Sequence, residues 1–515
     1  MANSQTHALP SPASRWLLPV LLTVQFLVSL DVSVVNVALP DIGCGLGFGA
    51  ESLAWVVNAY ALTFGGLLML GGRLADVVGR RRILIAGFVV FGVASLAGGL
   101  ARTPGQLIAA RAVQGVGAAA LAPVALVLIT VNHPAGAARA RALGLWGAAG
   151  AAGGAVGVLA GGLLTDWAGW RSVMLVNVPV VVAALLLARP AVPADTGGGP
   201  RARLDVVGAF LVTAGTALLV LGLVRTQTYG WTARQSAGLL AWALVLLAGF
   251  AFTETRVRQP LLRLGLLGNG PVLAANVFAL LMSAGQFAAF YFTSLYLQQV
   301  LGYGPTAAGS AFLPFCAGVV AGTVISTRAI ARLGPGRLLL VGGLIGAVGI
   351  ALFAATVAVD GGFLVSVLLP QVVASVGIGM CFVPLGTAAT EGVVPEETGM
   401  ASGLLNSSRQ VGGAVGLGVL VTVAAGQDGA GGRQGLVDGY SAAYWVAAAL
   451  LAVGAMAAGL TYGKGARKGA RKGARKEARK ETRKWVRAAE TPAGKLSPEK
   501  SGEGVDPAVP RSTKG

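Results

Sequence analysis

Apolar stretches long enough to cross a bilayer recur from one end of the chain to the other. A bilayer core of about 30 Å is spanned by roughly 20 helical residues. Only 11% of the residues are charged, against about 25% in soluble domains. The chain is therefore expected to be an all-α polytopic membrane protein. Its fourteen predicted transmembrane helices lie at 16–39, 53–72, 83–101, 105–131, 140–164, 171–189, 205–224, 236–254, 271–299, 305–331, 337–358, 363–386, 400–425 and 441–462.

Arginines are unevenly shared between the two sets of loops. Fourteen follow even-numbered helices and five follow odd-numbered ones. Because loops rich in basic residues stay in the cytoplasm, both termini are expected to be cytoplasmic, in a multi-pass protein of the inner cell membrane. The first run, 16–39, lacks a small-x-small cleavage pattern after a short apolar core. It is interpreted as a retained helix.

An internal repeat divides the chain. A shift of 255 residues superposes Arg73, Gly79 and Arg82 on Arg328, Gly334 and Arg337 of the second half. The same shift places Gln286 opposite Asp31. Parallel six-helix repeats are one way to build a central transport site. The expected parts are a cytoplasmic N-terminus at 1–15, a six-helix bundle at 16–189, a linker with two extra helices at 190–254, a second bundle at 255–462 and a basic tail at 463–515.

The loop after the second helix reads GGRLADVVGRRR, residues 71–82. Gly72 and Gly79 are expected to permit a tight cytoplasmic turn, Asp76 to cap a helix end, and the arginines to hold the loop inside. A charged stop between two helices is the alternative. The motif resembles the loop signature of the major facilitator superfamily, and its residues are Gly72, Asp76, Gly79, Arg80, Arg81 and Arg82.

Further stretches are similar to the fourteen-helix drug:proton antiporter branch of that superfamily. They are LDVSVVNVALPDI at 30–42, RAVQGVGAAA at 111–120, Trp170-Arg171, Asn177-Val178-Pro179, Asp205 with Gly208, YLQQVLGYGP at 296–305, and 402–413. Val158 departs from the pattern, which has proline there. The resemblance implies two six-helix bundles plus two extra central helices. GxxxG-like spacing predicts helix packing at Gly157, Gly161, Gly162, Gly412 and Gly416.

Asp31 and Arg111 are charged residues within predicted spans. Each costs at least roughly 2.5–3.5 kcal/mol at mid-membrane and should find a partner or water. The proton affinity of a carboxylate depends on a neighbouring guanidinium, so relative movement of the two residues could couple protons to transport. The alternative is a static structural ion pair.

Aromatic and amide side chains in three spans could form an apolar cavity with polar anchors. Lipid contact or packing is the alternative for each. The candidates are Gln25, Trp55, Asn58, Tyr60, Gln286, Phe287, Phe290, Tyr291, Tyr296 and Arg409, the last with Asn406 and Gln410 nearby.

The net charge is +19, of which the segment after Tyr462 carries +10, from 16 basic and 6 acidic residues. Its GARK repeats could bind anionic lipid or form a solvated, disordered extension. A nucleic-acid partner is not expected.

These features predict a transporter and no enzyme, because catalytic His, Cys and carboxylate clusters are scarce. The expected function is a proton-coupled antiporter that exports amphiphilic or cationic compounds such as antibiotics. The expected partners are that substrate, protons and lipid. A monomer without cofactor or metal is expected, since His7, His133 and three dispersed cysteines suit no metal site. A proton-coupled importer of the same fold and a membrane-embedded enzyme or sensor remain alternatives.

Overall fold

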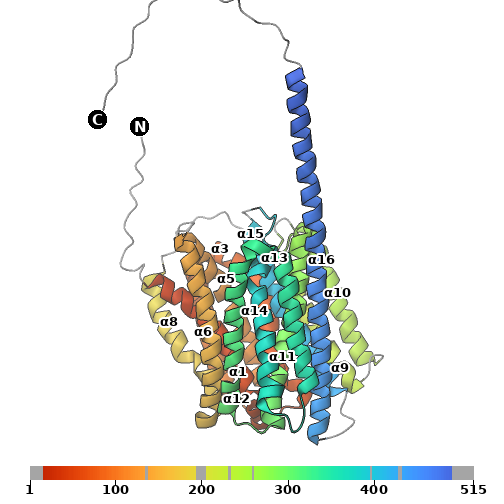
Figure 1. Cartoon of the computed structure of the whole chain (residues 1–515). Coiled ribbons are helices and arrows are strands. Elements are labelled where there is room, and N and C mark those ends of the chain that lie inside the picture. Colours follow the sequence, from red (N-terminus) through yellow and green to blue (C-terminus); the bar gives the residue numbers. More distant parts are fainter. Residues whose placement is uncertain are drawn as a thin grey trace, which may run out of the picture. The chain divides into compact units, whose positions relative to one another are not determined.

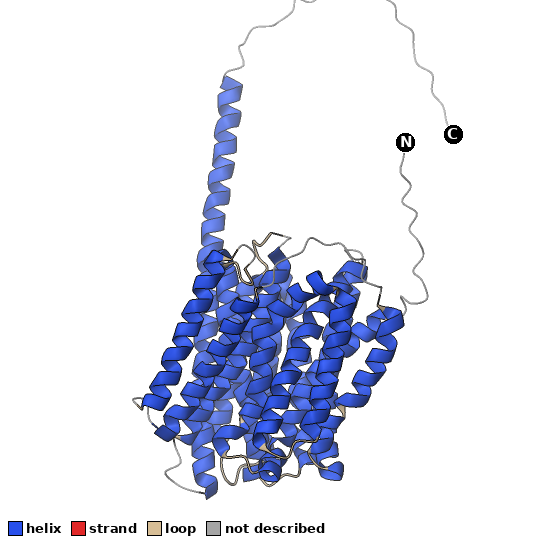
Figure 2. Ribbon diagram, turned by 180° about the vertical axis from the view of Figure 1, so that it is seen from behind, coloured by secondary structure: helices blue, strands red, loops and turns tan. Residues whose placement is uncertain are grey.

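We describe a computed structural model of the chain, in residues 16–133, 137–192, 205–229, 233–257, 260–394, 397–426 and 432–489. These residues form helices joined by loops, with no strand among them (Figures 1 and 2). The chain divides into two compact units, residues 1–463 and 464–515. The first contains all the predicted spans, and the second contains the basic tail.

The helices of the first half are α1 (Leu17–Leu46), α2 (Ala50–Leu53), α3 (Trp55–Val78), α4 (Arg80–Gly99), α5 (Pro104–Asn132), α6 (Ala137–Ala168), α7 (Arg171–Leu175) and α8 (Asn177–Ala191). The extra pair is α9 (Val206–Tyr229) and α10 (Arg234–Arg256). The second half contains η2 (Leu264–Gly268), α11 (Gly270–Leu295), η3 (Tyr296–Val300), α12 (Pro305–Ala311), α13 (Leu313–Thr356), η4 (Phe363–Leu368), α14 (Leu369–Ala389), α15 (Thr398–Ala425) and α16 (Gly432–Ala489).

Thirteen segments among the described residues are long and apolar enough to span a membrane, and one of them, Pro305–Thr356, has 52 residues. Gly334, with φ 73°, interrupts the helix inside it. The arms on both sides of Gly334 pack on α14, because Gly322 meets Val376 and Gly342 meets Met380. The long segment is thus a pair of spans that fold back at Gly334, and the fourteen-helix prediction is confirmed.

Several predicted boundaries were wrong. α1 continues through Pro40 to Leu46 and ends at Gly47 in the left-handed region, φ 69°, so Cys44 lies in the last turn of the helix. The turn after α3 is formed by Gly79 alone, with φ 116°. Gly72 lies inside α3 and faces Pro123. The last candidate span ends at Tyr462, as predicted. Its helix continues to Ala489, because Ala, Arg and Lys favour helix.

Glycines bring helix pairs into close contact in both halves. A Cβ on Gly157 or Gly161 of α6 would come within 2.8 Å of the carbonyl oxygens of Leu30 and Val34 in α1. Gly412 and Gly416 of α15 pack in the same way on Leu280 and Ala284 of α11. Such approaches require the absence of a side chain. The sequence shift of 255 therefore relates α6 to α15, as predicted.

The partner helices follow a different offset. Leu30 corresponds to Leu280 and Val34 to Ala284, so α1 is related to α11 by a shift of 250. By this packing register the counterpart of Asp31 is Leu281, and the expected pairing with Gln286 was wrong. The offsets 255 and 250 differ because the second half has five more residues between α11 and α15 than the first half has between α1 and α6. A comparison without gaps cannot detect this insertion.

The two halves meet through hydrogen bonds at the end of the first unit that carries Gly47, which we call the Gly47 side. Ser294 Oγ donates to the carbonyl oxygen of Asn36 at 2.8 Å, and Gln298 Nε2 donates to that of Val37 at 2.8 Å. Pro40 has no N–H for the carbonyl four residues earlier, which leaves the Asn36 oxygen free for Ser294. The opposite end, which carries Gly79, is called the Gly79 side.

Candidate functional site

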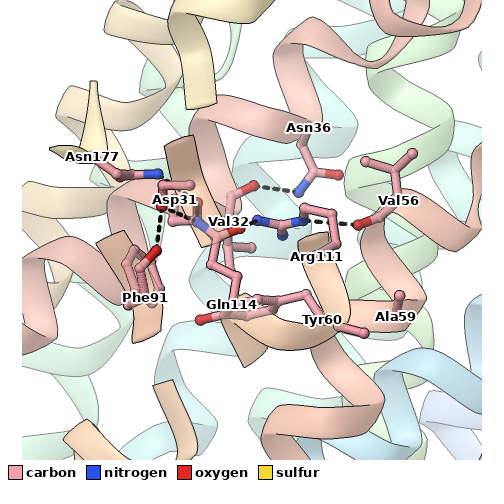
Figure 3. Close-up of polar contacts among 12 residues, drawn as sticks. Asp31, Val32, Asn36, Val56, Ala59, Tyr60, Phe91, Arg111, Gln114 and Asn177 are labelled. Atoms are coloured by element: carbon pink, nitrogen blue, oxygen red, sulfur yellow. Dashed lines mark hydrogen bonds and ion pairs between the residues drawn. The ribbon is translucent and has the colours of Figure 1, made fainter. Parts of the chain in front are cut away.

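The charged residues predicted within α1 and α5 lie together in the first half (Figure 3). Arg111 Nη1 lies 2.6 Å from Asp31 Oδ2, and the two residues are 1% and 0% exposed. Arg111 Nε donates to the carbonyl oxygen of Val56 at 3.0 Å. The guanidinium carbon lies 4.5 Å from the centre of the Tyr60 ring, an arrangement favourable for a cation. Arg111 thus has a counterion, a carbonyl and an aromatic face.

Two amides complete the surroundings of the carboxylate. Gln114 Nε2 and Asn177 Nδ2 donate to Asp31 Oδ1 at 2.7 and 2.8 Å. Gln114 also donates to Ser95 Oγ at 2.8 Å and accepts from Arg111 Nη1 at 2.7 Å. The Asp31 carboxylate therefore receives donors from α5 and α8, and charge-assisted bonds of this kind are the stronger ones.

Gln114, Asn177 and Ser95 were missed by the sequence analysis. Gln114 could have been found, since it is three residues after Arg111 and so shares its helix face. Asn177 belongs to a motif to which the sequence assigned no role. It is 146 residues from Asp31 along the chain, so the sequence alone does not indicate their contact. Ser95 carries no pattern in the sequence that indicates this contact.

Small residues in α5 let the helix come near enough to form the cluster. A Cβ on Gly115 would lie 2.5 Å from the Tyr60 carbonyl oxygen, and one on Gly117 would lie 2.8 Å from the Phe91 nitrogen. Thr63 Oγ1 donates across the same contact to the carbonyl of Ala112 at 2.8 Å. The sequence GVGAAA after Arg111 thus serves close packing, and that packing positions the guanidinium.

The members of the predicted cavity group lie in several different contacts in the structure. Phe290 stacks on Phe312 with ring centres 4.6 Å apart, Tyr291 is packed edge-on against Phe292, and Tyr296 donates its hydroxyl to the Ala358 carbonyl at 2.8 Å. These three aromatic residues stabilise the core of the second half.

The other members of the group are dispersed. Gln25, on α1, lies beside Gly150 of α6, and Tyr60 belongs to the Arg111 cluster. Asn58 is 0% exposed, and neither its amide nitrogen nor its oxygen has a hydrogen-bond partner in the described part of the chain. Trp55, Gln286 and Phe287 are half-buried, and so is Gln25. Trp55 and Phe287 pack against the same small apolar cluster, which consists of Ala61, Leu62, Val220 and Ala414.

Arg409 lies on α15 with its guanidinium over the Phe382 ring, 4.8 Å from the centre. Its Nε is buried without a hydrogen-bond partner. Asn406, one turn earlier, is exposed, and its amide donates to the Ser402 carbonyl at 3.1 Å. Arg409 and Asn406 thus lie on one face of the helix, as expected from their spacing.

The motif loop joins elements at the Gly79 side. Arg81 Nη2 donates to the Arg189 carbonyl at 2.6 Å, and Arg73 Nη2 donates to the Pro260 carbonyl at 2.6 Å. Arg80 and Arg82 also have partners, and the side chain of Asp76 lies outside the described residues. The arginines therefore tie α3 and α4 to α8 and to the start of the second half.

Two carboxyl groups also meet at the Gly79 side. Asp205 Oδ1 accepts from the Gly208 N–H at 2.8 Å, and Glu254 Oε2 accepts from the Leu262 N–H at 3.0 Å. Their other oxygens are buried without a donor, and both lie within 2.9 Å of where a Cβ on Gly208 would be. The Asp205 and Gly208 motif thus begins α9 and places its carboxyl beside α10.

Comparisons with known proteins show which family the chain resembles in sequence. A sequence model of the Major Facilitator Superfamily matches residues 21–417. The chain is 43% identical to the cephamycin export protein CmcT of Amycolatopsis lactamdurans, over 78% of this chain and 83% of that protein. It is 42% identical to the puromycin resistance protein pur8 of Streptomyces alboniger, over 81% and 83%.

The fold is also similar to solved structures. A bacterial homologue of the human lysosomal transporter Spinster, in an inward-facing and unoccupied conformation, matches with a TM-score of 0.60 and 17% identity. The match covers 88% of this chain and 97% of that one. At this identity the likeness concerns the fold alone.

Proposed function

The chain belongs to the major facilitator superfamily, and on that premise we propose that it is a proton-coupled exporter of small amphiphilic compounds, antibiotics among them. Export is supported by the similar proteins, which are described as a cephamycin exporter and a puromycin resistance protein. In this proposal the chain lies in the cell membrane as a monomer with both termini in the cytoplasm. The Gly47 side then faces outward.

The observation that carries the proton-coupling part of the proposal is the completely buried Asp31 carboxylate. Its partners come from two helices, Arg111 and Gln114 of α5 and Asn177 of α8. Because a guanidinium favours the charged form of a neighbouring carboxylate, a small shift of α5 against α1 changes the proton affinity of Asp31. Protonation in turn weakens the attraction for Arg111, so proton binding and helix position depend on each other.

In this proposal the coupling acts through movement of the two halves against each other. The hydrogen bonds of Ser294 and Gln298 to α1 hold the halves together at the Gly47 side. The two halves, 16–189 and 255–462, would rock about the centre, with the linker pair at 190–254 moving alongside. One proton that moves through 100 mV supplies roughly 2.3 kcal/mol, and about 1.4 kcal/mol corresponds to a tenfold concentration ratio. A gradient of a few tens-fold can therefore be supported.

Transport assays in two membrane orientations test the proposal. Energised everted vesicles that contain the protein are expected to accumulate labelled cephamycin, and a protonophore should abolish the accumulation. Vesicles with Asp31→Asn should equilibrate the compound without concentrating it. Accumulation only in right-side-out vesicles under an inward proton gradient would contradict export and favour an importer.

A further inference from the structure

The guanidinium of Arg409 has no counterion among the described residues. The cluster in the first half is neutral in sum, since Arg111 is matched by Asp31 at 2.6 Å. The Phe382 ring lies beneath the Arg409 guanidinium, and the buried Nε has no hydrogen-bond acceptor in the described part of the chain. A charge within a span is costly unless it is paired or hydrated. The positive charge at Arg409 is therefore unbalanced among the described residues.

Neighbouring residues on α15 define where this side chain points. Ser407 donates to the Gly65 carbonyl of α3, and Ser408 donates to the Asn276 side chain of α11 at 2.9 Å. These contacts occupy two faces of the helix. Asn406, Arg409 and Gly413 share the remaining face, because residues three and four apart are neighbours on a helix. Asn406 is exposed, so Arg409 lies one turn inward from an accessible position.

The surroundings of Arg409 combine this cation with aromatic surface. Phe382 of α14 lies against the guanidinium. One turn farther inward, a Cβ on Gly413 would lie 2.5 Å from the Phe287 ring of α11. An apolar wall with one charged group suits a ligand that carries an apolar body and an opposite charge. A cationic ligand would meet an uncompensated like charge there.

We infer that Arg409 binds an anionic group, a carboxylate in the simplest case, on the amphiphile that the protein exports. This inference rests on the proposed export function and narrows the expected substrate class, which included cations. The planar guanidinium can donate two parallel hydrogen bonds to a carboxylate, a geometry that lysine does not offer. Phe382 and Phe287 would contact the apolar part of the same molecule.

Binding to the purified protein in nanodiscs tests the inference without a need for transport. Three dansyl probes are used that differ only in their terminal group, which is a carboxylate, a primary amide or a trimethylammonium. Wild-type protein is expected to bind the carboxylate probe about tenfold more tightly than the amide, as one net charged hydrogen bond of about 1.5 kcal/mol implies. It should bind the trimethylammonium probe most weakly.

Variants assign the preference to one side chain. Arg409→Gln should remove the preference for the carboxylate while it changes amide binding by less than about threefold. Arg409→Lys should keep part of the preference, because it keeps the charge without the planar geometry. Arg234→Gln, at an exposed arginine at the start of α10, is the matched control and should bind all three probes like the wild type.

Several outcomes would overturn the inference. Wild-type protein that binds no carboxylate probe, or binds the trimethylammonium probe equally well, has no anion site at Arg409. Equal losses for all three probes in Arg409→Gln would indicate a structural arginine. Nanodiscs of phosphatidylglycerol that abolish carboxylate binding, relative to phosphatidylcholine, would assign Arg409 to a lipid headgroup. Failed antibiotic export with an intact carboxylate preference would contradict the proposed function alone.

Discussion

Replacing Asp31 by asparagine removes the anion that is paired with the buried Arg111 guanidinium. The carboxylate is 0% exposed and accepts from Arg111, Gln114 and Asn177 at 2.6 to 2.8 Å. Breaking a buried ion pair on one side costs about 3–5 kcal/mol, because the other charge is left uncompensated. We expect Asp31→Asn to lower the free energy of unfolding by about this amount, and to abolish concentrative transport because the site can no longer change charge.

A double substitution separates the two effects. Asp31→Asn with Arg111→Gln removes both charges and retains amides that can hydrogen-bond, so its cost should be nearer the roughly 1–3 kcal/mol of lost polar contacts. The coupling energy between the two sites should therefore be at least about 2 kcal/mol. It is measured from unfolding by sodium dodecyl sulfate in mixed micelles, with proton-driven accumulation measured in vesicles for each variant.

Asp31→Glu is the conservative comparison and should retain some transport, because the proton site persists one methylene away. Additive losses in the double variant would refute the ion-pair argument. Wild-type accumulation by Asp31→Asn would refute proton coupling at this residue.

Four further predictions concern other parts of the chain. Glu254→Gln should raise the melting temperature by a few degrees, since its amide can donate to the unpaired oxygen of Asp205; a lowered melting temperature contradicts this. Gly157→Leu should prevent folding, seen as aggregation in size-exclusion chromatography, because a Cβ already comes within 2.8 Å of α1. Cys44, exposed at the Gly47 side, should react with an impermeant thiol reagent in intact cells once the other two cysteines are replaced, and labelling only after lysis reverses the proposed topology. Deletion of 464–515 should leave transport nearly intact, since no candidate span lies in 464–489, the part of this segment that the structure describes.

Most of the fold could be predicted from the sequence because a bilayer permits few structures. Each apolar run of suitable length had to be a helix, and each of the fourteen predicted spans overlaps one or more helices of the structure. Helix boundaries were less predictable. Proline leaves the carbonyl four residues earlier without its donor, but the helix continues where another group donates to that carbonyl. This is the case at Pro40, where Ser294 bonds the Asn36 oxygen.

The candidate site could be predicted only in its charges. Asp31 and Arg111 stand out in apolar runs, and their pairing follows from the cost of an isolated charge. Asn177 and Ser95 are ordinary polar residues, and only the packing of α4 and α8 against α1 and α5 brings them to the carboxylate. The aromatic group was predicted by composition alone, and composition does not distinguish Tyr296, a core residue, from a residue that meets a ligand.

The acceptor at the Gly47 side belongs to the backbone of Asn36, and it is free because residue 40 is proline. A substitution at position 36 therefore keeps this carbonyl oxygen. Substitution of Ser294 or of Pro40 affects the hydrogen bond to it directly. A mutational scan of this closure should thus be asymmetric, with tolerance at 36 and sensitivity at 40 and 294. Substitutions that restore an N–H at 40 would compete with Ser294 for the carbonyl and weaken this contact between the halves. Substitutions at positions 40 and 294 are therefore expected to alter resistance without altering any residue that contacts the substrate.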